Sequence, residues 1–130
     1  MAEKNEIRKD NSNRIGNEIF KKKAEIAIKQ IGNLSKHFMN IYLVDLLIII
    51  QENKDINEKE LVEEMIIRNK SSNIATIQFV NAAAESIRQW LILKANDSQE
   101  KNRIIEISKE RNGAINILKM FAEYIENSKI

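Results

Sequence analysis

The strongest local structural signal in the sequence is the start of a helix at Asn57. Glu60 follows three residues later, the spacing at which the two side chains cap each other's backbone N–H groups. Ile56 precedes the cap and Leu61 occupies the fourth helical position, so these two residues can also form a hydrophobic staple. We therefore predict a helix from Asn57 whose buried face comprises Leu61, Val62, Met65 and Ile66.

A second helix is predicted after the polar segment 68–73. This segment reads RNKSSN and offers several N-cap candidates. Beyond it, apolar residues recur every three or four positions, which predicts a helical stripe that faces a core. The stripe consists of Ile74, Ile77, Val80, Ala84, Ile87 and Leu91.

Two short apolar runs follow, residues 91–95 and 103–108. Asn96, Asp97 and Ser98 between them are residue types typical of a turn. We therefore predict a two-stranded hairpin with Lys94, Lys101 and Arg103 around its tip. Helix, turn, helix and hairpin is the order of a winged helix-turn-helix module. The predicted fold class is mainly α with a small β-hairpin, and an all-helical bundle with no wing is the structural alternative.

Further helices are predicted on both sides of this module. Helical apolar spacing indicates one helix over about residues 15–31 and another over about 113–128. The segment 35–52 is apolar on nearly all sides and should be a central helix, although periodicity does not exclude a buried strand over 46–50. The C-terminal helix should pack on the first helix of its own chain or on the helices of a second chain.

The resulting domain organisation is simple. Residues 1–14 are polar without periodicity and are expected to form a flexible N-terminal arm. Residues 15–130 are expected to form a single winged-helix domain, with the wing at about 91–108. A chain of 130 residues can bury one core of this size.

Composition excludes several classes of chemistry. The chain has no cysteine and one histidine, His37, which removes thiolate catalysis, thiolate metal sites and paired-histidine sites. No carboxylate stands in an arrangement that indicates catalysis, so we expect neither an enzyme nor a cofactor. The longest apolar run is too short to span a membrane, and the charged N-terminus lacks the apolar core of a secretory signal. We expect a cytoplasmic protein.

The chain resembles the MarR-type winged-helix transcription regulators over roughly residues 41–125. The most telling part is LILKANDSQEKNRIIEISKERNG, where Leu91 begins a strand and Asp97 occupies the place of the wing's aspartate. Lys101 and Arg103 lie near the wing's basic positions, and Gly113 precedes the last helix. The resemblance implies a homodimer held by the N- and C-terminal helices. It also allows a small-molecule effector, for which no residue identifies a pocket.

These patterns predict a homodimeric transcription regulator, a repressor, that binds double-stranded DNA sequence-specifically at a pseudo-palindromic site. Expected phosphate contacts are Lys70, Lys94, Lys101 and Arg103, with Arg88 a further backbone candidate. Expected base readers are Ser72, Asn73, Thr76 and Gln78, because Asn and Gln pair with adenine edges.

The formal charge of +2 is only mildly basic and does not by itself demand a nucleic-acid partner. Two alternatives therefore stay open. One is a winged-helix module that binds protein instead of DNA. The other is a plasmid or phage replication or partition protein that binds DNA.

Overall fold

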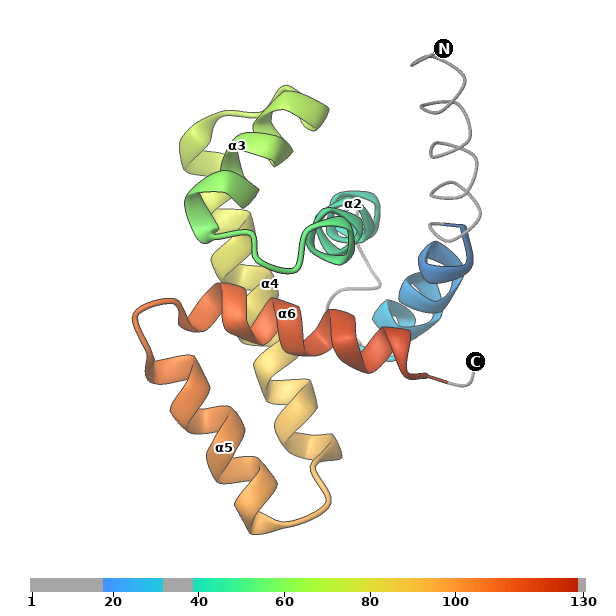
Figure 1. Cartoon of the computed structure of the whole chain (residues 1–130), viewed down its shortest axis with the longest axis vertical. Coiled ribbons are helices and arrows are strands. Elements are labelled where there is room, and N and C mark those ends of the chain that lie inside the picture. The colour runs from blue at the N-terminus through green and yellow to red at the C-terminus, as the bar shows by residue number, and fades with distance from the viewer. Residues whose placement is uncertain (1–17, 32–38, 129–130) are drawn as a thin grey trace.

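The computed structural model describes residues 18–31 and 39–128 of the chain, and this part is helical with no strand. Helical residues 18–29 come first, and the order continues α2 (Met39–Glu52), α3 (Glu58–Asn69), α4 (Asn73–Lys94), α5 (Ser98–Lys109) and α6 (Gly113–Glu126) (Figure 1). The long helix α4 contacts α3, α5 and α6. It is therefore the axis on which α3, α5 and α6 assemble.

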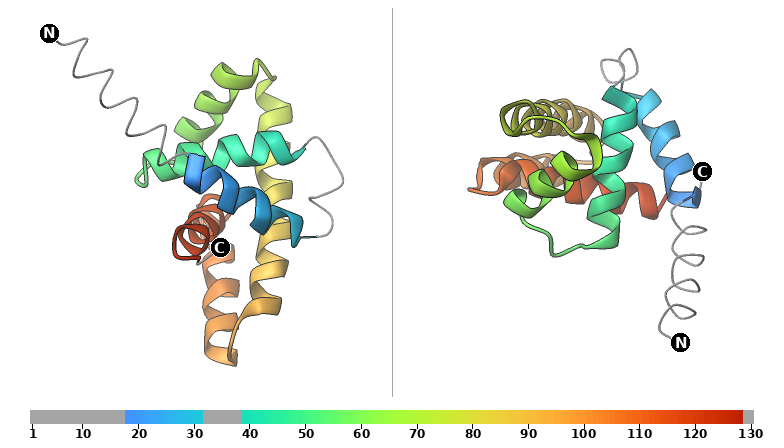
Figure 2. Two further views of the ribbon diagram at one scale, coloured as in Figure 1. Left: turned by 90° about the vertical axis from the view of Figure 1, so that its right-hand side faces the viewer. Right: turned by 90° about the horizontal axis from the view of Figure 1, so that it is seen from above.

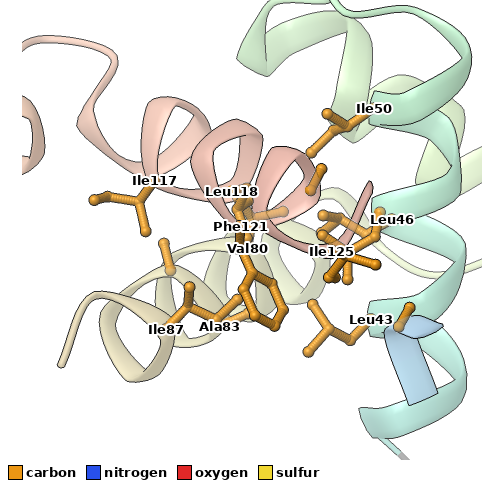
Figure 3. Close-up of a cluster of buried hydrophobic side chains, with 14 of the residues drawn as sticks. Leu43, Leu46, Ile50, Val80, Ala83, Ile87, Ile117, Leu118, Phe121 and Ile125 are labelled. Carbon is orange, nitrogen blue, oxygen red and sulfur yellow. The ribbon is translucent and has the colours of Figure 1, made fainter. Parts of the chain in front are cut away.

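The core forms where α2, α4 and α6 meet. Figure 3 shows apolar side chains from these three helices pointing toward one another, and Leu46, Val80, Leu118, Phe121 and Ile125 among them are almost completely buried. Helix α2 contacts α3 and α6, which agrees with the prediction of a central helix. Since the segment 46–50 is helical, the strand alternative is excluded.

The predicted start of α3 is confirmed. The backbone N–H of Glu60 donates to Asn57 Oδ1 over 2.8 Å, and the backbone N–H of Asn57 donates to Glu60 Oε1 over 3.3 Å. Ile56 and Leu61 on either side of this cap are both buried. The reciprocal cap satisfies two N–H groups that would otherwise lack a partner at the helix start.

The predicted wing is wrong. Residues 91–94 form the last turn of α4, because Trp90 and Leu91 are buried there. Asp97 is not a hairpin tip but the N-cap of α5, and its side chain accepts from the backbone N–H of Glu100 over 2.8 Å. Glu100 Oε2 in turn accepts from the backbone N–H of Asn96 over 2.9 Å. The polar turn therefore starts a helix, and the winged fold class does not hold.

The predicted stripe of α4 is confirmed at four residues, which are all buried, but is wrong in the first turn of the helix. The buried four are Val80, Ala84, Ile87 and Leu91. Ile74 is 70% exposed and Ile77 is 37% exposed. Thr76 and Ala83 are buried in their place, alongside Val80. The two isoleucines were predicted to face the core and instead face outward.

The apolar faces of the terminal helices are buried within the chain. Phe20, Ala24 and Ile28 of the N-terminal helix belong to the same buried cluster as Phe121 and Ile125 of α6. Lys23 Nζ also donates to the backbone carbonyl of Glu126 over 3.4 Å. The C-terminal helix therefore packs on the first helix of its own chain, which is one of the two packing partners predicted for it. The predicted arm over residues 1–14 and His37 lie outside the described residues.

Candidate nucleic-acid interface

Helices α3 and α4 pack together and are joined by a turn of residues 70–72 (Figure 2). Lys70 ends α3 in the left-handed conformation with φ 53°, and its backbone N–H donates to the carbonyl of Ile66. Ser72 then caps α4, since its hydroxyl oxygen accepts from the backbone N–H of Ala75 over 3.1 Å. The turn thus reverses the chain abruptly and fixes the start of α4 beside α3.

Thr76 stabilises this turn from inside. Its side chain is 3% exposed. The hydroxyl donates to the backbone carbonyl of Ser72 over 2.7 Å and shares a hydrogen bond of 2.8 Å with the hydroxyl of Ser71. The predicted base reader Thr76 is therefore directed into the protein, where it has a structural role.

The other three predicted base readers lie on the surface at the start of α4. Ser72, Asn73 and Gln78 are all exposed. The Ser72 oxygen is occupied by the helix cap, but its O–H remains able to donate, since a hydroxyl has one donor and two acceptor positions. Ser72 and Asn73 follow Lys70 closely at the turn, whereas Gln78 lies more than one helical turn further along α4 and about 140° around the helix from Asn73.

Lys70 is the predicted phosphate contact nearest to them. It is exposed, and within the described part of the chain it forms no ion pair. The neighbouring Arg68 is different, because its guanidinium lies 3.2 Å from Glu52 and 3.7 Å from Glu64. The positive charge at the turn is therefore small and comes mainly from Lys70.

Arg88 lies further along α4 and is paired. Its Nε donates to Glu85 Oε2 over 3.1 Å, and Gln89 donates to the same carboxylate. The hydrogen bond from Arg88 lowers the pKa of the Glu85 carboxyl, and it also raises the pKa of Arg88. An arginine whose guanidinium is already paired with a carboxylate is a weak candidate for a phosphate contact.

The remaining predicted contacts, Lys94, Lys101 and Arg103, lie toward the opposite end of α4. This helix has 22 residues and is about 33 Å long at a rise of about 1.5 Å per residue. Lys94 Nζ lies 5.9 Å from the centre of the Trp90 ring, while Lys101 and Arg103 are exposed on α5. Because the segment predicted to form the wing is helical, the structure does not bring these residues together with Ser72, Asn73 and Gln78.

A groove of about 830 Å³ lies between the end of α4, α5 and α6. Leu91, Ile104 and Met120 supply apolar lining, and Tyr124 forms an edge-to-face contact with Trp90 beside it. The groove is lined by three basic and three acidic side chains. They are Lys94, Arg103 and Lys119 with Glu100, Glu110 and Glu123. The groove thus has no net charge that would select a nucleic acid.

Metal binding and membrane crossing find no support in the described residues. These residues contain no group of three or more His, Asp or Glu side chains that could hold a metal ion. None of their helices combines the length and the apolar character that crossing a membrane requires.

The sequence patterns did not identify two exposed residues near the turn, Asn81 and Ile67. Asn81 is exposed on the same face of α4 as Ile74 and Gln78, and Ile67 of α3 is 71% exposed. The spacing of residues 74, 78 and 81, four and then three apart, is the signal that could have grouped them on one helix face.

Comparison of the chain with protein-family models, curated proteins and solved structures gave no significant match. The resemblance to MarR-type regulators therefore stays a prediction, and its most telling segment forms a helix instead of a wing.

Proposed function

We propose that this chain binds double-stranded DNA through α3 and α4, a helix-turn-helix whose second helix enters the major groove. The observation that carries the proposal is the short turn of residues 70–72, which holds the start of α4 at the surface beside α3. A turn of three or four residues between two packed helices is typical of this motif. In such proteins the first residues of the second helix contact base edges.

The chemistry of the exposed groups supports this assignment. The amides of Asn73 and Gln78 offer both a donor and acceptors to a base edge. The Lys70 ammonium and the Ser72 hydroxyl stand at the turn, where a DNA backbone would pass, and both can donate to phosphate oxygens. The proposed role is binding without catalysis.

The scarcity of positive charge at the turn sets the expected strength of binding. Arg68 is engaged by Glu52 and Glu64, which leaves Lys70 as the main cation. Each phosphate neutralised contributes a slope of about −0.9 to the dependence of log K on log salt. We therefore expect a shallow slope of about −1 to −2 per chain.

A cytoplasmic, homodimeric repressor on a pseudo-palindromic site is part of the same proposal. The apolar stripes first expected to hold the dimer are buried inside the chain, so a dimer would need another surface. Ile19 and Ile26 are exposed on the N-terminal helix. They are seven residues apart and so share one face, which makes that face the candidate for the contact.

A protein-binding role is the second candidate, and one observation favours it. Ile67, Ile74 and Ile77 are all exposed at the end of α3 and the start of α4. Exposed apolar side chains that gather on one surface are typical of protein contact sites. This role predicts no salt-dependent affinity for duplex DNA.

Selection of bound sites from a random duplex library, followed by anisotropy titration of the selected duplex at several salt concentrations, tests the proposal. Gln78→Ala should weaken binding about tenfold, because a bidentate contact discriminates by about 1–3 kcal/mol. Gln99→Ala is the matched control, since Gln99 is an exposed glutamine on α5. Equal effects of the two changes, or an absence of duplex binding, would overturn the proposal and favour the protein-binding role.

A further inference from the structure

The outward face of α4 is centred on Ile74, Gln78 and Asn81. These three residues are exposed and are spaced four and three residues apart, so they lie along one line of the helix. Ile77 borders this line and is partly exposed. On the other side the border is formed by Ala75 and Ala82, both exposed and small.

This face carries no charge. No Asp, Glu, Lys or Arg occurs between Ser71 and Ala84. The first charged residue beyond it is Glu85, which is held by Arg88. Three turns of an exposed helix surface are therefore made only of amides, isoleucines, alanines and hydroxyl-bearing residues.

Each base pair shows a different pattern of groups in the major groove. Guanine is read best by Arg or Lys and cytosine by Asp or Glu, whereas adenine is read by Asn or Gln and the thymine methyl group by apolar side chains. The outward face of α4 has the residue types for adenine and thymine and none of the charged types for guanine and cytosine.

We propose that this face selects A·T-rich duplex DNA, with Ile74 and Ile77 on thymine methyl groups and Gln78 and Asn81 on adenine edges. The inference rests on the proposed function and names its substrate class. It also accounts for the exposure of Ile74, because an isoleucine that is 70% exposed is removed from water when it meets a methyl group in the groove.

The small side chains at the border allow the approach that this contact requires. Ala75 and Ala82 project little from the helix, so α4 can lie deep in a groove of about 12 Å width. Apolar contact with a methyl group excludes water over a small area only. Burying one methyl-sized group corresponds to about fourfold in affinity.

Replacing thymine by deoxyuridine in an A·T-rich duplex removes the methyl groups and leaves the base pairing unchanged. The wild-type protein should bind the deoxyuridine duplex about fourfold more weakly for each methyl group that an isoleucine would otherwise cover. Ile74→Ala should bind the thymine duplex more weakly and should discriminate less between the two duplexes. Leu93→Ala is the matched control, because Leu93 is an exposed aliphatic residue near the other end of the same helix.

A second arm tests the adenine contacts with duplexes that contain 7-deazaadenine, which lacks the N7 acceptor. These duplexes should bind the wild type more weakly, and Gln78→Ala should reduce the difference. Equal affinity of the wild type for thymine and deoxyuridine duplexes, or a preference for G·C-rich duplexes, would overturn this inference while leaving the proposed function in place. Failure to bind any duplex would instead reject the proposed function.

Discussion

The hydroxyl of Thr76 donates a hydrogen bond to the backbone carbonyl of Ser72, with 2.7 Å between the two oxygen atoms. The same hydroxyl lies 2.8 Å from the hydroxyl of Ser71, so one buried side chain connects the first turn of α4 to the turn after α3. The start of α4 is thereby fixed from within, while Asn73 and Gln78 are exposed on the outside.

Thr76→Val removes this hydroxyl with little change of shape. We expect the free energy of unfolding to fall by about 1–3 kcal/mol, because the Ser71 hydroxyl loses its buried partner. Urea denaturation measures the change. Because Thr76 faces the interior, the affinity of the folded variant for duplex DNA should stay within about twofold of the wild type. A variant as stable as the wild type, or a large loss of binding, would contradict the assigned role.

The two helix starts at Asn57 and Asn112 should respond differently to alanine. Asn57 accepts from the backbone N–H of Glu60, whereas the Asn112 side chain makes no cap hydrogen bond. We expect Asn57→Ala to cost about 1 kcal/mol and Asn112→Ala less than about 0.5 kcal/mol. Thermal or urea unfolding of both variants checks the difference, and equal costs would argue against the capping box.

Gly113 leaves no room for a side chain. A Cβ at this position would clash with the backbone carbonyl oxygen of Ser108. Gly113 starts α6 and Ser108 lies in α5, so relief of the clash requires a shift of helix backbone. Gly113→Ala should destabilise the protein by about 1–3 kcal/mol or more. Ser98→Ala, at the exposed first position of α5, is the control and should cost less than about 0.5 kcal/mol. A Gly113→Ala variant of wild-type stability would contradict the close packing of α5 and α6.

The Glu85–Arg88 pair should make a small, pH-dependent contribution to stability. The folded-state pKa of Glu85 is lowered by the hydrogen bond from Arg88, so the folded protein binds fewer protons at this site than the unfolded chain does. The contribution is therefore present above the unfolded-state pKa and is lost as the pH falls through the folded-state pKa.

Because the Glu85 side chain is 55% exposed, the loss in Glu85→Gln should not exceed about 1 kcal/mol at pH 7. The difference from the wild type should vanish in strong acid. Urea denaturation across the acid range checks this, with Glu63→Gln as a control at another exposed glutamate. A difference that persisted at low pH would show that the pair does not cause it.

Local sequence signals predicted some parts of the fold and misled on others. The Asn57–Glu60 spacing located the start of α3, because capping depends only on neighbouring residues. The same spacing at Asp97 and Glu100 starts α5, but it was interpreted as a turn between strands. Short apolar runs such as residues 91–95 are compatible with a strand or with the end of a helix. Here the packing of Trp90 against Phe121 and Tyr124 favours the helix.

The buried residue in the first turn of α4 could not be predicted from composition, although the stripe from Val80 to Leu91 was predicted correctly. Ile74 and Ile77 belong to a good apolar stripe with Val80, yet the buried side includes Thr76 instead. A buried threonine is compatible with a core when its hydroxyl finds partners close by in the chain, as Ser71 and Ser72 provide here. This arrangement leaves the two isoleucines exposed on the surface that we propose binds DNA.

An NMR titration of the isotope-labelled protein with a selected duplex locates the DNA-binding surface residue by residue. We predict that the amide signals of residues 70–82 shift or broaden first, at the turn and over the outward face of α4. The signals of α5, including Lys101 and Arg103, should change little. Changes confined to α5 and the groove beside α6, or no changes at all, would contradict DNA binding by α3 and α4.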